Sequence, residues 1–108
     1  MTAPRATEQQ CQQAIVQAAR LAGWMVHAER PAQKSNGRWV TSIQGDPGWP
    51  DLVLLREGEL MIIELKRRPY KASEEQLRWL AELQEARVDA RIVFVPEDMP
   101  WLLARLTR

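Results

Sequence analysis

The chain has 108 residues, in which 15 Lys and Arg and 14 Asp and Glu side chains leave a formal net charge of +1. This length suits a single domain, residues 1–108, that buries roughly two thirds of its unfolded surface. The sequence lacks the ~20-residue apolar stretch of a membrane span and the apolar segment of a signal peptide, so we expect a soluble, cytoplasmic protein. Its single cysteine, Cys11, excludes an internal disulfide bond and a cysteine-based zinc cluster.

Residues 7–21 are expected to form the first helix. Thr7 and Gln10 have the spacing of a capping box, and Gly23 is a natural stop. Glu8, in the first turn, either complements the helix dipole or reaches a functional site from the end of the packed face. That face is expected to consist of Cys11, Ala14, Ile15, Ala18 and Ala22.

The next segment alternates between short extended stretches and turns. Residues 24–28 read as a strand, residues 29–38 as a polar and basic loop, and residues 39–43 as a short strand or extended loop. Residues 45–50 contain two glycines and two prolines, which predicts a tightly shaped turn that ends at Asp51. Trp39 and Trp49 could stack on nucleic-acid bases, although packing is the more common role of tryptophan in a small domain.

Two apolar runs, residues 52–55 and 60–63, surround Glu57-Gly58 and predict a β-hairpin. With the turn centred between Glu57 and Gly58, paired residues have numbers that add up to 115, so Asp51 is expected opposite Glu64. Directly opposed residues have Cβ atoms about 5 Å apart. Two carboxylates at that distance repel each other unless a cation lies between them.

Glu64 and Lys66 are expected on the same face of the strand, because side chains alternate, while Leu65 points into the core. Mg²⁺ is commonly held by one or two carboxylates together with water and phosphate oxygens, and a nearby lysine can orient a water or stabilise developing charge. The pattern of Asp51, Glu64 and Lys66 therefore predicts a metal-dependent phosphodiesterase site. The alternative is an ordinary turn next to the solvated face of an edge strand.

Ser73 and Gln76 open a second helix with capping-box spacing, after Pro69 breaks the chain. Gln76 therefore has two candidate roles, as part of the cap or as a site residue, which would compete for one amide. A strand at 91–95 and a short helix at 101–106 follow. The expected fold is α/β, a mixed sheet flanked by helices. The buried side of the second helix is expected to comprise Leu77, Leu80, Ala81 and Leu83.

Asp51, preceded by Pro50 and followed by Glu64-Leu65-Lys66, resembles the signature of PD-(D/E)XK nucleases. The chain is similar to the small standalone members of the VRR-NUC family along nearly its whole length. The matching positions are Glu8, Gly23, Trp24, His27, 37–39, 45–51, 64–66 and 73–79.

This resemblance implies a restriction-endonuclease-like core and a divalent-metal nuclease using Mg²⁺ or Mn²⁺. Asp51, Glu64 and the backbone carbonyl of Leu65 would bind the metal. Lys66 would assist the attacking water, and Gln76 and Glu8 would complete the site, with Glu8 as a further candidate metal ligand. The resemblance also suggests a homodimer that selectively cuts branched DNA such as four-way (Holliday) junctions, in a bacterial cell or a phage-infected host.

The charges form an acidic centre between positive arms. Residues 46–65 carry one basic and five acidic side chains, whereas residues 1–45 carry five and two, and residues 66–108 carry nine and seven. Basic side chains near the path of a strand can contact its phosphates, although each one could equally be a solubilising surface charge. His27 could also bind phosphate. The candidate DNA contacts are Arg30, Lys34, Arg38, Arg67, Arg68 and Lys71.

Three alternative functions remain at this stage. The first is a DNA-binding module with the same fold and no catalysis, and the second is a general or flap-type nuclease. The third is a structural or partner-binding protein in which the acidic pair and Lys66 form an ordinary ion cluster. The intact set of two acids and a lysine argues against the first.

Overall fold

The hairpin expected in the middle of the chain forms the centre of the main sheet. β4 (Leu52–Arg56) and β5 (Glu59–Lys66) pair antiparallel, with Leu52 opposite Ile63 and Arg56 opposite Glu59. This is the register predicted from the sequence, and it is confirmed. Glu57 and Gly58 have φ angles of 48° and 80°, so the connection is a tight two-residue turn whose backbone twist matches that of the strands.

The computed structural model describes residues 6–29, 32–33, 35, 37, 39–40 and 43–108. Within these residues the main sheet has the strand order β1-β4-β5-β6, and β2 and β3 form a separate hairpin. The remaining elements are α1 (Glu8–Leu21), β1 (Met25–Ala28), β2 (Ala32–Gln33), β3 (Trp39–Val40), α2 (Glu74–Glu85), β6 (Asp89–Phe94) and α3 (Met99–Thr107).

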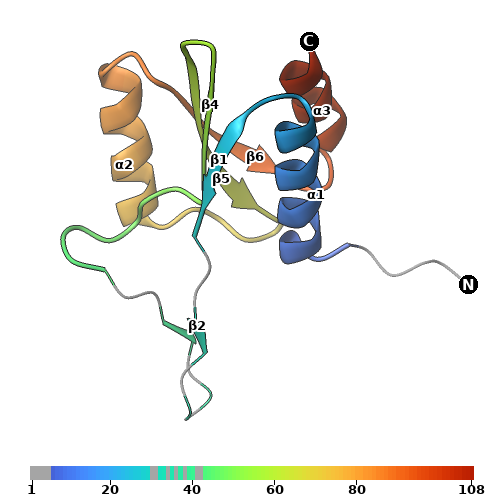
Figure 1. The fold of residues 1–108 in the computed structure, drawn as a ribbon. Coiled ribbons are helices and arrows are strands. Elements are labelled where there is room, and N and C mark those ends of the chain that lie inside the picture. Colours follow the sequence, from blue (N-terminus) through green and yellow to red (C-terminus); the bar gives the residue numbers. More distant parts are fainter. Residues whose placement is uncertain (1–5, 30–31, 34, 36, 38, 41–42) are drawn as a thin grey trace, which may run out of the picture.

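Helices cover both faces of the main sheet. α1 and α3 lie side by side on one face and α2 lies on the other, while the β2–β3 hairpin extends beyond the sheet (Figure 1). β1 runs antiparallel to β4, and β6 runs parallel to β5 with α2 as the crossover between them. The predicted α/β fold with a mixed sheet flanked by helices is confirmed. No helix of the described residues is long and apolar enough to span a membrane.

The larger hydrophobic core lies between the sheet and the α1/α3 layer. Alternation along β5 directs Met61, Ile63 and Leu65 into this core, where each is at most 1% exposed. Full burial of such a side chain contributes about 1.5–3 kcal/mol. The opposite face of the sheet has only a small cluster around Ile62 and Leu80. The stability of the fold therefore rests mainly on the α1/α3 side.

Both expected capping boxes are present, but two helix faces differ from the prediction. In α1, Ala14 is exposed and Ala19 is buried instead. In α2, Leu77 is 49% exposed and Ala81 is also exposed. The reason is that α2 meets the sheet mainly along β6, so the side of the helix that faces away from this line stays in solvent.

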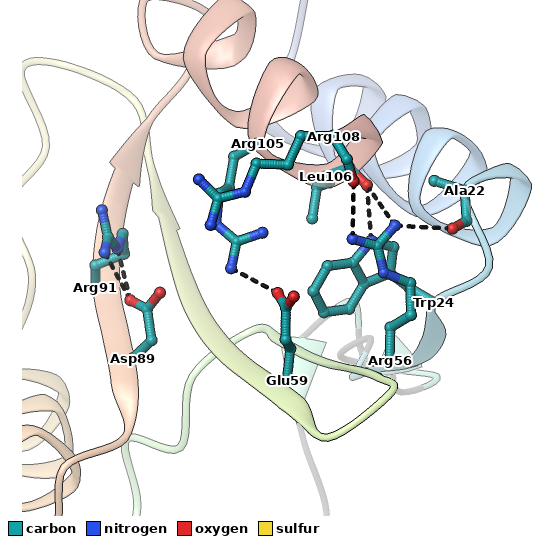
Figure 2. Close-up of polar contacts among 9 residues, drawn as sticks. All are labelled: Ala22, Trp24, Arg56, Glu59, Asp89, Arg91, Arg105, Leu106 and Arg108. Carbon is teal, nitrogen blue, oxygen red and sulfur yellow. Dashed lines mark hydrogen bonds and ion pairs between the residues drawn. The ribbon is translucent and has the colours of Figure 1, made fainter.

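Arg56, at the end of β4, joins the C-terminal ends of α1 and α3 (Figure 2). Its Nη1 donates to the carbonyls of Ala22 and Leu106 at 3.0 and 3.1 Å, and its Nη2 donates to the carbonyl of Arg108 at 3.2 Å. The guanidinium lies 4.4 Å from the ring centroid of Trp24, whose Nε1 donates to the Leu106 carbonyl at 2.9 Å. One side chain thus satisfies carbonyls that helices leave without partners at their ends.

We expect Arg56→Ala to lower the free energy of unfolding by about 2–3 kcal/mol, because charged hydrogen bonds to partly buried carbonyls are lost together. Urea unfolding followed by tryptophan fluorescence measures the change. Arg78→Ala, at an exposed position of α2, is the matched control and should change stability by less than about 0.5 kcal/mol. Equal effects of the two substitutions would contradict the role assigned to Arg56.

Candidate active site

The turn before β4 places Asp51 beside β5. The backbone N–H of Leu65 donates to Asp51 Oδ2 at 2.8 Å, and the backbone N–H of Glu29 donates to the Asp51 carbonyl at 3.3 Å. Pro50, the preceding residue, is buried. Both the side chain and the backbone of Asp51 are therefore held in place, one position beyond the Leu52–Ile63 pair of the hairpin.

Glu64 is a buried carboxyl group on the α2 side of the sheet, and the residue is only 1% exposed. Its Oε1 accepts a hydrogen bond from Gln76 Nε2 at 2.8 Å and lies 3.5 Å from Lys66 Nζ. The Lys66 side chain is 16% exposed, and Leu65 between them is buried in the opposite core. Strand alternation thus brings the acid and the lysine together, as the sequence predicted.

The two carboxyl groups of Asp51 and Glu64 share one environment that disfavours charge. Burial and, to a smaller extent, the nearby Asp51 charge raise the pKa of Glu64 to about 8, while the charge of Lys66 opposes both effects. Burial also raises the pKa of Asp51, against the lowering effect of the Leu65 N–H. A hydrogen bond between the two carboxyl groups requires that one of them carries a proton.

Glu64 Oε2 has no donor from any N–H or O–H group among the residues that the structure describes. A buried carboxylate oxygen without a partner is destabilising unless a proton or a cation meets it. The shared proton is one solution and a bound cation is the other. This atom is therefore the point at which a cation would interact most favourably with the pair.

Glu8 faces the same site from the first turn of α1. The side chain is half-buried, and burial followed by the charge of Asp51 raises its pKa, while the charge of Lys66 lowers it. Glu8 thus lies within electrostatic range of both Asp51 and Lys66, in addition to its position in the helix dipole.

Gln76 makes both of the contacts that its two candidate roles would require. Its Oε1 accepts from the backbone N–H of Ser73 at 2.9 Å and completes the cap of α2, while its Nε2 donates to Glu64 at 2.8 Å. The expectation that the two roles compete was wrong. A side-chain amide has an acceptor end and a donor end, so one group serves the helix and the site together.

The turn that carries Asp51 also packs against the first turns of α2, which the sequence did not reveal. The Trp79 Nε1 donates to the Pro47 carbonyl at 3.0 Å, and the rings of Trp49 and Trp79 meet edge to face with centroids 5.0 Å apart. Trp49 is therefore a packing residue. The Trp39 side chain lies outside the described residues. The sequence signal was Gly48, a glycine inside a turn that precedes a candidate acid.

Three of the predicted DNA-contacting residues come shortly after Lys66 in the sequence. Arg67 is half-buried, and Arg68 and Lys71 are exposed. Arg68 also lies 3.7 Å from Glu97 and stacks 4.0 Å from the Phe94 ring centroid.

His27 is exposed, pairs with Val53 across the strands and lies 4.0 Å from Glu29. The other three candidates, Arg30, Lys34 and Arg38, lie outside the described residues.

The described residues contain no group of three or more His, Cys, Asp or Glu side chains placed to hold a metal ion. They do contain the Asp51–Glu64 pair with the cationic Lys66 beside it. Two carboxylates meet the needs of Mg²⁺ when water and substrate phosphate provide the other oxygen ligands. The arrangement therefore suits a divalent ion that is only partly enclosed by protein.

Comparison with known protein families gives a match to the VRR-NUC domain model over residues 3–96. A solved structure of a VRR-NUC domain superposes with a TM-score of 0.65 at 22% sequence identity, covering 92% of this chain and 97% of that one. A comparison with curated proteins gave no match. The structural likeness concerns the fold, whereas the family match covers the residues of the carboxyl pair.

Without metal, we expect the stability of the protein to fall as the pH rises. The pKa of Glu64 is about 8 in the folded chain against a usual value of 4.5. The folded state holds the proton more tightly, so its stabilising contribution is full below pH 4.5 and is lost as the pH rises through about 8. Glu64→Gln imitates the protonated group and should exceed the wild type by roughly 2–4 kcal/mol near pH 8.5.

Urea unfolding in EDTA between about pH 5 and 8.5 measures this difference, most of which should disappear near pH 5. Glu57→Gln, at an exposed position in the hairpin turn, is the control and should show no such trend. A difference between Glu64→Gln and the wild type that stays constant over this pH range would contradict the raised pKa.

Proposed function

Because the chain belongs to the VRR-NUC domain family, whose members are PD-(D/E)XK-like nucleases, we propose that it is a divalent-metal-dependent DNA endonuclease. Family membership implies a nuclease-type function in DNA processing, and nucleases of this family are typically dependent on divalent metal. The observation that carries the proposal is the pair formed by the buried Glu64 and the half-buried Asp51, with Lys66 Nζ 3.5 Å from Glu64.

The residues at the pair fit a hard divalent cation, Mg²⁺ or Mn²⁺. Asp51 and Glu64 supply carboxylate oxygens, and the Leu65 carbonyl and Glu8 are the further candidate ligands. Glu64 Oε2 is buried and has no hydrogen-bond donor among the described residues, so a bound cation would compensate its lost hydration. A bound ion of this type would lower the pKa of a coordinated water and offset the charge of the phosphate.

Each protein group around the pair has a distinct task in this proposal. Gln76 holds Glu64 through Oε1, which leaves Oε2 for the ion. The Leu65 N–H holds Asp51 through Oδ2. Lys66, mostly shielded from solvent beside Glu64, would orient the attacking water or stabilise charge on the phosphate. These contacts support direct hydrolysis by water, without a covalent intermediate on the protein.

The substrate that we propose is branched DNA such as a four-way junction, cut by a homodimer. Arg67 and Arg68 follow β5 directly and Lys71 comes shortly after them, so the three would contact phosphates beside the cleaved bond. Each chain contributes the Asp51–Glu64 pair, so paired cuts in two strands of a junction need two chains. A symmetric dimer is the simplest arrangement that supplies them.

We expect the wild type to cleave four-way junction DNA with Mg²⁺ or Mn²⁺ and not with EDTA. Asp51→Asn and Glu64→Gln should each lower the rate by at least about a thousandfold, because either change removes a charged ligand. End-labelled junction, flap, duplex and single-stranded DNA, resolved on denaturing gels, provide the measurement. Asp46→Asn and Glu57→Gln are the matched controls, since both acids are exposed.

The pattern of products distinguishes the alternatives. Paired symmetric cuts in the junction support the junction-selective enzyme, and equal cutting of all four substrates supports a general nuclease instead. Preferred cutting of the flap supports a flap-type enzyme. Binding of the junction without cleavage of any substrate under either metal would reject catalysis and leave a DNA-binding module.

We also expect Mn²⁺ to raise the thermal stability of the wild type. A ligand that binds only the folded state at a hundred times its Kd adds about 2.7 kcal/mol. The Asp51→Asn/Glu64→Gln double variant should lose this gain, and Asp46→Asn should retain it. Thermal melts with Mn²⁺ and with EDTA measure the effect, and a wild type that melts at the same temperature in both would indicate an ordinary ion cluster.

A further inference from the structure

The turn that ends at Asp51 and the start of α2 make three separate contacts. Trp79 Nε1 donates to the Pro47 carbonyl at 3.0 Å, and the Trp49 and Trp79 rings meet at 5.0 Å with an interplanar angle of 89°. Gly48 lies so close to α2 that an added Cβ would be 2.6 Å from the Glu75 carbonyl carbon and 2.9 Å from the Gln76 nitrogen. We call these contacts the turn–helix clamp.

We infer that Gly48 and Trp79 are positioning residues for catalysis, which act by fixing the Asp51 turn and the Gln76 amide relative to each other. This inference rests on the proposed nuclease function. Neither residue touches the carboxyl pair in any described contact. Each acts through a residue that does. Gly48 precedes Asp51 by three positions and leaves no room for a Cβ beside the Gln76 backbone, and Trp79 contacts Pro47 and Trp49 of the turn that ends at Asp51.

The clamp is needed because the rest of α2 makes few contacts with the sheet. Within α2, all of whose residues the structure describes, Leu80 is the one buried side chain, and Gln84, near the C-terminal end, donates from Nε2 to the Ala90 carbonyl at 2.8 Å. The amide of Gln76 nevertheless has to stay within hydrogen-bond distance of Glu64. A shift of the helix by about 1 Å would remove that bond, since such bonds weaken beyond roughly 3.2 Å. The close approach of Gly48 to the backbone of Glu75 and Gln76 limits such a shift, because α2 cannot move toward the turn without a clash.

The backbone of Gly48 explains why a glycine stands at this position. Its φ of +100° already disfavours other residues, and the neighbouring atoms are backbone, which cannot rotate away from a Cβ. Gly45, in the same turn, has a φ of +118° but nothing within 4 Å of its added Cβ. The two glycines therefore share the conformational requirement and differ in the close approach to α2.

We expect Trp79→Phe to lower kcat for DNA cleavage by tenfold to a hundredfold with little change in KM, because a misplacement of about 1 Å near the reacting groups has effects of this order. The substitution keeps an aromatic ring and removes the hydrogen bond to Pro47. Trp101→Phe is the matched control, since Trp101 lies on α3 and stacks on Arg91 away from the site. It should keep kcat within about twofold.

A double-mutant cycle with Gln76→Ala tests whether Trp79 acts through Gln76. Trp79→Phe should have little further effect on kcat in the Gln76→Ala background, since the amide that it positions is gone. Additive losses in kcat, or a Trp79→Phe enzyme that behaves like Trp101→Phe, would overturn the inference. Gly48→Ala should reproduce the loss in kcat and Gly45→Ala should not, at a temperature at which both variants are folded.

A second measurement does not depend on activity. In the wild type, the side-chain NH₂ of Gln76 should give a distinct NMR signal with slowed hydrogen exchange, which Trp79→Phe shifts and Trp101→Phe leaves in place. An unchanged Gln76 signal in Trp79→Phe would reject the coupling. If the wild type cleaves no DNA and Trp79→Phe still shifts the Gln76 signal, the proposed nuclease function is rejected and the clamp is retained. The two failures are therefore distinguishable.

Discussion

The arrangement of this protein depends on a carboxyl group, Glu64, that is buried beside a second carboxyl group. Removing such a group from water is strongly unfavourable unless hydrogen bonds and opposite charges replace the lost hydration. The surrounding elements provide those partners from two directions. Gln76 comes from α2 and Lys66 from two residues further along β5, while the turn before β4 brings in the second carboxyl group, Asp51. The hairpin register and the position of α2 are therefore both constrained by one side chain.

The two faces of the sheet differ in what they contain: one holds most of the apolar core, and the other holds the candidate site. The α1/α3 face contains the large apolar core, and at the far end of the hairpin Arg56 and Trp24 bind the ends of both helices (Figure 2). The α2 face has a small apolar cluster and carries the acids. A polar site with a buried carboxyl group is tolerated where most of the folding free energy comes from elsewhere. Because α2 packs lightly on the sheet, its placement also depends on the contacts with the turn.

The relation to the VRR-NUC family concerns more than the architecture. At 22% identity, the solved VRR-NUC domain shows that the same sheet and helices form from a very different sequence. Folds of this type host many functions, so the nuclease assignment rests on the family match and on the carboxyl pair with its lysine. Gln76 illustrates how a small domain supports such a site, because one amide both completes a helix cap and holds a catalytic candidate.

The sequence by itself determined the parts that depend on local periodicity. Alternation in β5 separated Glu64 and Lys66 from Leu65, and the Glu57-Gly58 turn set the register that brings Asp51 toward Glu64. Only the tertiary structure decided the exposure of Leu77 and the dual contacts of Gln76. Those features depend on where α2 lies against the sheet. Contacts between segments about thirty residues apart, such as Pro47 with Trp79, help to fix that position and leave no periodic pattern in the chain.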